Sequence, residues 1–173
     1  GANFNRSALV AARWTAQRLT RANLRYVREL QRGPCEVAAG VWICHGSPLD
    51  EDAYLFSTAD VEEIFATHPG HVTFFGHTHL PSVFVRSSHE TRVALLRGEE
   101  GTLELVPGCR YLLNPGSIGQ PRDRDPRASF MTYDSVKRLV RWHRVPYDIE
   151  RAQERILRAG LPRSLADRLA AGA

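Results

Sequence analysis

The chain has few of the residues that mark a disulfide framework or a thiolate metal site. Its 173 residues contain three cysteines, Cys35, Cys44 and Cys109, and no two of them stand in a Cys-x-x-Cys arrangement. An odd, scattered set of cysteines builds neither kind of site. We therefore expect all three to be small buried hydrophobic residues.

Long apolar runs are also missing. No segment approaches the roughly 18 consecutive apolar residues that a membrane-spanning helix needs. The first residues, Gly-Ala-Asn-Phe-Asn-Arg, lack the apolar stretch of a signal peptide. These absences predict no membrane partner and, by default, a cytoplasmic location.

Lysine is nearly absent, and no block of like charge occurs. Of the 23 basic residues only Lys137 is a lysine, and the formal net charge is +4. The arginines are interspersed with acidic residues, a pattern typical of a solvated surface. We therefore predict no nucleic-acid partner; such a partner would require an affinity that falls steeply with salt.

The sequence does contain enough apolar material for one substantial core. Hydrophobic residues make up 43% of the chain, and its length suits a single domain over residues 1–173. The mixture of helical and strand-like segments predicts an α/β (α+β) fold. We expect helices at residues 7–19, 20–32, 59–67 and 148–160 and a short last helix from 161, with strands at 36–39, 41–44, 72–75, 82–86, 91–96, 103–106, 110–113, 128–133 and 136–145.

A central apolar segment leads into two histidines. Residues 72–75 are β-branched or aromatic without polar alternation, which is typical of a strand buried on both faces. Gly-His-Thr-His follows at 76–79. Residues two apart in an extended segment point to the same side, so His77 and His79 are predicted to face one metal centre. The alternative is that these histidines serve packing or solvation at a strand end.

A second apolar strand, at residues 41–44, also ends in histidine and glycine. The ends of such strands gather at one edge of a sheet. We therefore expect His45 to converge with His77 and His79. A separation above about 10 Å would exclude a shared metal site, because nitrogen–metal bonds are near 2 Å and paired metals lie about 4 Å apart.

Three motifs occur in a fixed order: His-Gly-Ser-Pro at 45–48, Gly-His-Thr-His-Leu-Pro at 76–81 and Asn-Pro-Gly-Ser at 114–117. With this set the chain resembles the calcineurin-like metallophosphoesterases. It is most similar to the small bacterial branch described as serine/threonine phosphatase or diadenosine tetraphosphatase-like. The similarity extends from Phe4-Asn5 to the C-terminal helices, and the ordered set is specific although each motif alone is weak.

The resemblance implies a four-layer αββα sandwich that hydrolyses a phosphate ester with metal-activated hydroxide. It implies His45 and His77 as ligands of one metal and His79 as a ligand of the other. Neutral imidazoles suit two divalent ions of Mn, Fe, Zn or Co better than Mg²⁺ or Ca²⁺. A metal pair about 3.5–4 Å apart can clamp a phosphoryl oxygen for in-line attack.

The family's earlier motifs, Asp-x-His, Gly-Asp and Gly-Asn-His-Asp/Glu, do not occur upstream of His45. In the family they supply the bridging carboxylate, further ligands and the proposed general acid. We therefore expect the C-terminal portion of the sandwich, an N-terminally incomplete domain without its first strands. No catalytic residue is identified in this chain, and stand-alone activity is in question. An open apolar edge, prone to edge-strand pairing or homo-oligomer formation, is expected in place of those strands.

Other interpretations remain open. The chain is alternatively an inactive remnant that serves as a binding or interaction module. Substitute metal ligands near the three histidines are conceivable without any family pattern to support them: Asp50, Asp52, Asp60, His68 and His71.

The loop at residues 114–127 is expected beside the histidines. Arg122 is its best candidate to bind a substrate phosphate through bidentate hydrogen bonds. Alternatively, Arg122 forms a surface ion pair with Asp123 or Asp125.

Overall fold

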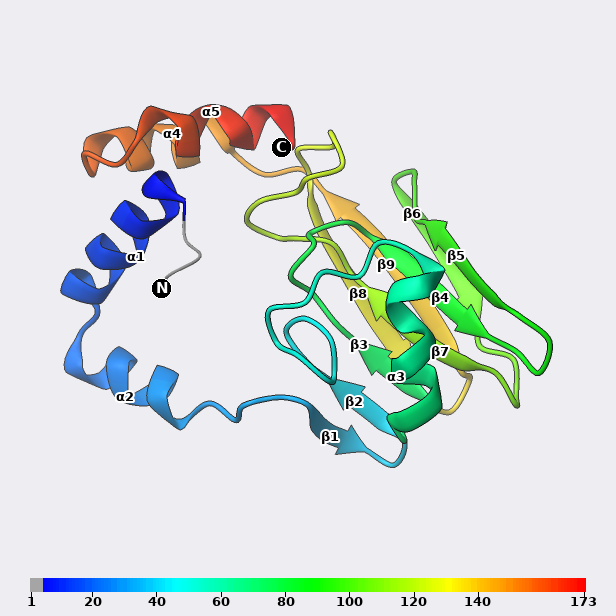
Figure 1. Cartoon of the computed structure of the whole chain (residues 1–173). Coiled ribbons are helices and arrows are strands. Elements are labelled where there is room, and N and C mark those ends of the chain that lie inside the picture. Colours follow the sequence, from blue (N-terminus) through cyan, green and yellow to red (C-terminus); the bar gives the residue numbers. More distant parts are fainter. Residues whose placement is uncertain (1–4) are drawn as a thin grey trace.

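The computed structural model of the protein describes residues 5–173, which form two β-sheets and a set of peripheral helices (Figure 1). One sheet has six strands in the order β1-β2-β3-β7-β4-β5, and the other has three in the order β6-β9-β8. The expected α/β class with two sheets is confirmed. Phe4, where the family resemblance begins, lies outside the described residues.

Every expected strand and helix has an observed counterpart, but β6 begins three residues before the expected strand at 103–106, so Gly101 belongs to the strand and not to the preceding loop. The strands are β1 Cys35–Ala38, β2 Val41–Ile43, β3 Val72–Phe74, β4 Ser82–Arg86, β5 Thr91–Leu95, β6 Glu100–Glu104, β7 Arg110–Asn114, β8 Ala128–Asp134 and β9 Leu139–Val145. The helices are α1 Arg6–Arg18, α2 Arg21–Glu29, the 3-10 turn η1 Thr58–Val61, α3 Glu62–Thr67, α4 Ile149–Arg158 and α5 Arg163–Ala171.

The last strand begins later than expected. Residues 136–138 belong to the turn between β8 and β9, because the Asp134 carboxylate accepts hydrogen bonds from the backbone N–H groups of Val136 and Lys137. The side chain of Val136 is 93% exposed. The prediction that β9 begins at Val136 is therefore wrong, because this apolar residue lies in the exposed turn before the strand.

The centre of the large sheet is parallel, and this sets the position of the candidate site. Strands β2, β3 and β7 run in one direction with Ile43, Phe74 and Leu113 in register. Strand β4 returns antiparallel to β7. The segments that follow β2, β3 and β7 therefore leave the sheet at one edge.

Two apolar layers hold the sheets. Alternate residues point to opposite faces of a strand, so Phe84 and Leu112 pack towards α3 whereas Val83 and Leu113 pack towards the second sheet, where they meet Val140. Figure 1 shows α3 lying across the six-stranded sheet. The result is a helix–sheet–sheet arrangement with most of the buried apolar side chains in its two interfaces.

The N-terminal helices differ from this packed region. Asn5 and Thr20 cap α1 and α2 by accepting hydrogen bonds from the backbone N–H groups of Ala8 and Asn23. Neither helix has a buried residue. In Figure 1 both lie away from the sheets, with α1 near the α4–α5 pair.

Two other sequence-based expectations have clear outcomes. The three cysteines are free thiols that are only partly buried, so the prediction that they are buried is wrong. Burial still raises the pKa of the Cys44 thiol to about 12, with the nearby Cys35 as a smaller cause. Among residues 5–173, no helix has the length and apolar character needed to cross a membrane.

Candidate metal centre

His45 and His77 meet at the carboxyl edge of the parallel strands. Nε2 of His45 and Nδ1 of His77 lie 3.0 Å apart, and their rings are edge to face with centroids separated by 4.8 Å. Two imidazole nitrogens bound at about 2.1 Å and nearly at right angles around one metal would be about 3 Å apart. The pair therefore fits the donor geometry of a shared metal ion.

The histidine loop does not have the extended backbone that the sequence suggested. Strand β3 ends at Phe74, and His77 and His79 both have left-handed conformations, with φ of 63° and 60°. We predicted that His77 and His79 face one metal because residues two apart in an extended segment point to the same side. That reason is wrong, because the segment is not extended. Non-glycine residues in this region cost about 1–3 kcal/mol each and persist only where surrounding contacts hold them.

Asn114, at the end of β7, supplies those contacts. Its side-chain amide donates to the Gly76 carbonyl at 2.7 Å and to Thr78 Oγ1 at 2.9 Å, and Asn114 is fully buried. The Gly76 N–H in turn donates to the His45 carbonyl at 2.7 Å. Asn114 thus ties the histidine loop to its neighbouring strands. Sequence reasoning assigned it no role, although its place in the Asn-Pro-Gly-Ser motif after an apolar strand was the available signal.

His79 lies beside the pair with one nitrogen already oriented. Its Nδ1 is 2.7 Å from the Gln120 carbonyl, so that nitrogen donates its proton and Nε2 is left as the metal-binding atom. Burial lowers the pKa of His79, the hydrogen bond to Gln120 opposes this effect, and the charges of Arg122, His77 and His45 lower the pKa further. Burial, followed by the charge of His45, also lowers the pKa of His77. Both effects favour the neutral imidazole, which is the form that binds metals.

Arg122 is close to these histidines. Its backbone N–H donates to the His79 carbonyl at 3.4 Å, and its Nε is buried without a hydrogen-bond partner among the described residues. The two carboxylates considered as surface partners bond other arginines: Asp123 pairs with Arg144, and Asp125 pairs with Arg127 at 2.7 Å. A buried guanidinium N–H without a protein acceptor is open to a water molecule or an anion as its partner. Phosphate binding by Arg122 stays a prediction.

Two of the five alternative ligands, Asp60 and His68, are engaged elsewhere. The Asp60 carboxylate accepts from the backbone N–H groups of Phe56 and Ser57, and His68 bonds Thr73 at 3.2 Å. Asp52 is near enough to affect the pKa of His77. Within residues 5–173, no three His, Cys, Asp or Glu side chains are grouped so as to hold a metal ion.

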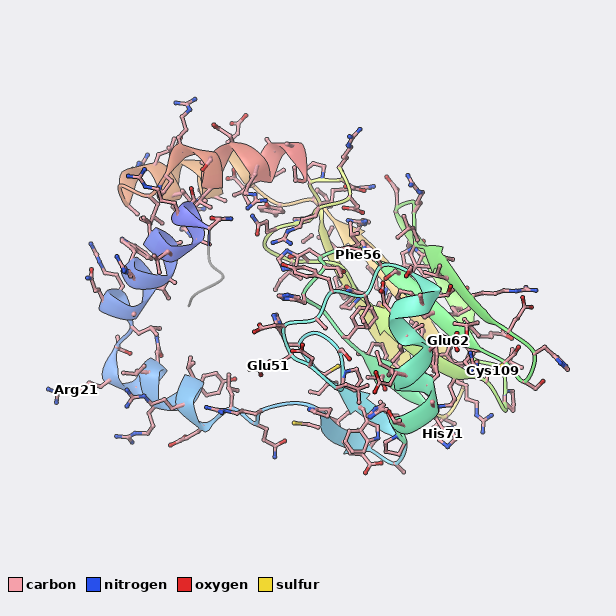
Figure 2. All side chains as sticks on the ribbon, viewed as in Figure 1. Arg21, Glu51, Phe56, Glu62, His71 and Cys109 are labelled. Atoms are coloured by element: carbon pink, nitrogen blue, oxygen red, sulfur yellow. The ribbon has the colours of Figure 1, made fainter. Side chains whose placement is uncertain are left out.

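A surface hollow lies at the other end of the sheet. Its volume is about 510 Å³, and its lining includes His71, Cys109 and Tyr111. Figure 2 shows His71 near the lower end of α3 and Phe56 near the upper end. This hollow is separate from the candidate metal centre, which is marked by the convergence of imidazoles.

Comparison with known proteins identifies the family. The chain is 33% identical over 172 residues to the uncharacterized protein MJ0912 of Methanocaldococcus jannaschii. The aligned region covers 98% of this chain and 68% of that protein. The chain is 32% identical to the crystal structure of a metallophosphoesterase from Sphaerobacter thermophilus, with a TM-score of 0.82 over 94% of this chain and 68% of that one. The chain belongs to the metallophosphoesterases.

A further structure shares this metallophosphoesterase fold at lower sequence similarity. The hypothetical protein PH1004 from Pyrococcus horikoshii OT3 is 18% identical, with a TM-score of 0.70 over 99% of this chain and 62% of that one. No family model matches the sequence. The family resemblance given by the three ordered motifs is thus confirmed, while the bacterial phosphatase branch stays a prediction.

Proposed function

We propose that this chain belongs to a dinuclear, metal-dependent phosphoesterase in which His45 and His77 bind one metal and His79 binds the other. The 3.0 Å approach of His45 Nε2 to His77 Nδ1, at the strand ends of a metallophosphoesterase fold, carries the proposal. Imidazole donors favour Mn, Fe, Zn or Co over Mg²⁺ or Ca²⁺.

The chain's own residues would bind and orient the phosphate ester. Bound metals would supply Lewis-acid stabilisation of the phosphoryl oxygens and an activated water as the nucleophile. The Gln120 carbonyl fixes the ring of His79, and the Asn114 amide fixes the loop that carries both His77 and His79. The Arg122 Nε–H, which has no hydrogen-bond partner within residues 5–173, would donate to a phosphoryl oxygen beside them.

We expect weak metal binding and slow hydrolysis from residues 1–173 alone. Three imidazoles are fewer ligands than two metals take, and no bridging carboxylate is identified to offset the repulsion between two cations. A general acid is not identified either, and loss of general acid–base catalysis typically costs about 10²–10⁴-fold in rate. The further ligands are proposed to come from the earlier family motifs, which this sequence does not contain.

Metal titration tests the assignment without relying on activity. Binding of Mn²⁺ or Zn²⁺ is measured by calorimetry for the chain, for His77→Asn and for a control, His143→Asn, in a histidine that stacks on Phe130 in the three-stranded sheet. We expect at least about tenfold weaker binding for His77→Asn, because even partners of metal ligands matter by about 10–100-fold. The control should bind as the unmodified chain does.

Hydrolysis of p-nitrophenyl phosphate tests the activity. Supplying the absent motifs, in a fused segment or a separate peptide from a relative, should restore metal binding and turnover together. If the unextended, metal-loaded chain is as fast as a complete family member, other residues build the site and these assignments are wrong.

A second candidate function is a binding or interaction module without catalysis. It is favoured by the finding that no metal-holding group of three side chains exists within residues 5–173. Strands β6 and β8 are the edges of the small sheet, and Phe130 of β8 is 37% exposed, so pairing with a second copy is a natural mode. Absence of metal binding together with a dimer in sedimentation would support this candidate.

A cytoplasmic location remains a prediction.

A further inference from the structure

The segment at residues 120–122 holds His79 from two sides. The Gln120 carbonyl is 2.7 Å from Nδ1 of His79, and the Arg122 N–H donates to the His79 carbonyl at 3.4 Å. Pro121, between them, is fully buried. The orientation of this proposed metal ligand therefore depends on the groups that fix residues 120–122.

Arg168 of α5 reaches this segment from the last helix of the chain. The amide oxygen of Gln120 accepts from Nε of Arg168 at 2.6 Å and also from one of its terminal guanidinium nitrogens. A guanidinium has only N–H donors, so the amide oxygen is the atom that faces it. The same Nε–H is shared with the Ala173 carbonyl at 2.7 Å. Arg168 thus links the end of α5 to the segment that holds His79.

The end of α5 also packs directly on the loop that continues from this segment. The Arg124 N–H donates to the Gly172 carbonyl at 2.9 Å, and a Cβ on Gly172 would lie 2.8 Å from the Asp125 backbone nitrogen. Leu169 is buried and anchors α5 in the protein. Figure 1 shows the C-terminal end of α5 beside this loop. The close approach requires glycine at position 172 and holds Arg168 within reach of Gln120.

We propose that Arg168 is a positioning residue for His79. Through Gln120 it keeps Nδ1 of His79 as a hydrogen-bond donor, which leaves Nε2 free for the metal. This inference rests on the proposed function, because it concerns a ligand of the same centre. Both hydrogen bonds from Arg168 to Gln120 end on a side chain whose backbone carbonyl meets the His79 ring. The effect of Arg168 on the metal centre is therefore indirect.

The sign of the effect on metal affinity distinguishes positioning from direct electrostatics. The charge of Arg168 repels a bound cation, so its removal by itself should strengthen metal binding. Loosening of His79 should weaken metal binding instead. Partners of metal ligands change the affinity by about 10–100-fold, and Arg168 is one step further from the metal. We therefore expect a loss of about threefold to tenfold in Arg168→Ala.

NMR of the histidine-ring nitrogens in the metal-free chain, at about pH 8 where the neutral ring prevails, tests the positioning. His79 should be the Nδ1–H tautomer in the unmodified chain and a mixture of tautomers in Arg168→Ala. Arg168→Lys keeps the charge without the planar fork of donors and should also give a mixture. Gln120→Glu keeps the acceptor and should retain the single tautomer. The control is Arg163→Ala, which removes an exposed arginine of α5 paired with Asp167 and should change nothing.

Titration with Zn²⁺, followed at the same ring nitrogens, measures the effect on the metal. Zn²⁺ should shift Nε2 of His79 in the unmodified chain. The midpoint should rise by about threefold to tenfold in Arg168→Ala, and also in Gly172→Ala, which separates α5 from the loop without changing any charge. In a chain that already carries Gln120→Ala, Arg168→Ala should have no further weakening effect, because both changes break the same link.

The two readouts separate failure of this inference from failure of the proposed function. If the tautomer of His79 depends on Arg168 but Zn²⁺ leaves the His79 ring unchanged, the positioning stands and His79 is not a metal ligand. Three results overturn the positioning and leave the metal centre intact: a mixture of tautomers in the unmodified chain, a single tautomer in both Arg168→Ala and Gly172→Ala, or tighter Zn²⁺ binding in Arg168→Ala.

Discussion

The two-sheet region and the N-terminal helices both contain many apolar residues but bury them very differently. In the sheets, Leu113 and Val140 have no exposed surface. In α1 and α2 no residue is buried, and Val27 and Leu30 near the end of α2 are 49% and 52% exposed. Apolar residues at helical spacing therefore predicted the helices correctly without predicting that a surface covers them. Burial needs a partner as well as a pattern.

The largest change in stability is expected from a pair of matched leucine truncations, one in the sheets and one in α2. Leu113→Ala removes a side chain packed between the sheets and should destabilise the protein by about 2–5 kcal/mol, from lost burial and the cavity left behind. Leu30→Ala, at the end of α2, should cost less than about 0.5 kcal/mol, because exposed sites leave no cavity. Urea denaturation followed by circular dichroism measures both. Equal losses would show that the helices are as well packed as the sheets.

An ion pair gives the second comparison. Arg144 is buried with 2% of its side chain exposed and pairs with Asp123, with Asp125 Oδ2 3.8 Å from its Nε. Removing one partner of a buried pair costs about 3–5 kcal/mol, and the remaining carboxylate should limit Asp123→Ala to about 2 kcal/mol.

The control for that pair lies on a helix surface. Glu154 and Arg158 of α4 pair at 2.7 Å while both are more than half exposed. Glu154→Ala should change the unfolding free energy by no more than about 0.5 kcal/mol. A larger loss in the α4 variant than in Asp123→Ala would reverse the proposed ranking.

The sequence was most informative where local chemistry and burial agree. Apolar runs bounded by glycine or proline gave β4 with its observed bounds, Ser82–Arg86, and Asp148 caps α4 as expected by accepting from the Arg151 N–H. The approach of His45 to His77 followed from parallel strands ending at one edge. That argument needs only topology.

Two features of the site were not predictable from local pattern. The left-handed backbone of His77 and His79 depends on the Asn114 amide, which comes from a strand far along the chain. The parallel arrangement of the Tyr54 and Phe56 rings, 5.7 Å apart, depends on the burial of Leu55 between them. Long-range packing decides both, and neither leaves a periodic signal in the sequence.

Two loop glycines, Gly46 and Gly119, allow a comparison of a closely packed loop position with an open one. A Cβ on Gly46 would lie 2.5 Å from the Glu51 carbonyl oxygen and 2.8 Å from that of Ala53, and both are backbone atoms that cannot move alone. Gly46→Ala should therefore cost about 1–3 kcal/mol, as overpacking does elsewhere. It should also weaken metal binding, because Gly46 directly follows His45. Gly119→Ala, where a Cβ meets nothing within 4 Å, is the control and should change neither property.

The smallest effect is expected in the pH dependence of stability. His68 follows α3, is buried, and bonds Thr73, with the Trp42 ring edge-on beside it. Burial lowers the pKa of His68 below its usual 6.5, and the charge of Arg110 lowers it further. Below pH 6.5 the unfolded chain therefore binds a proton that the folded chain does not, and the unfolding free energy should fall until the folded-state pKa is passed.

This fall in the unfolding free energy is measured from denaturation midpoints between pH 8 and 5, taken about every half pH unit. Above pH 6.5 both states are neutral at His68, so the midpoint should be flat. His77 and His79 titrate in the same direction; hence His68→Gln should reduce the slope without abolishing it. His89→Gln, in the exposed turn between β4 and β5, is the matched control. Hydrogen bonds from backbone N–H groups lower the pKa of Asp60 below 3.8, and hydrogen bonds from Arg127 lower that of Asp125. These carboxylates lose their contribution to the unfolding free energy only below pH 3.8, which is outside the range from pH 8 to 5. A slope unchanged by His68→Gln would show that protonation of His68 costs the folded chain nothing.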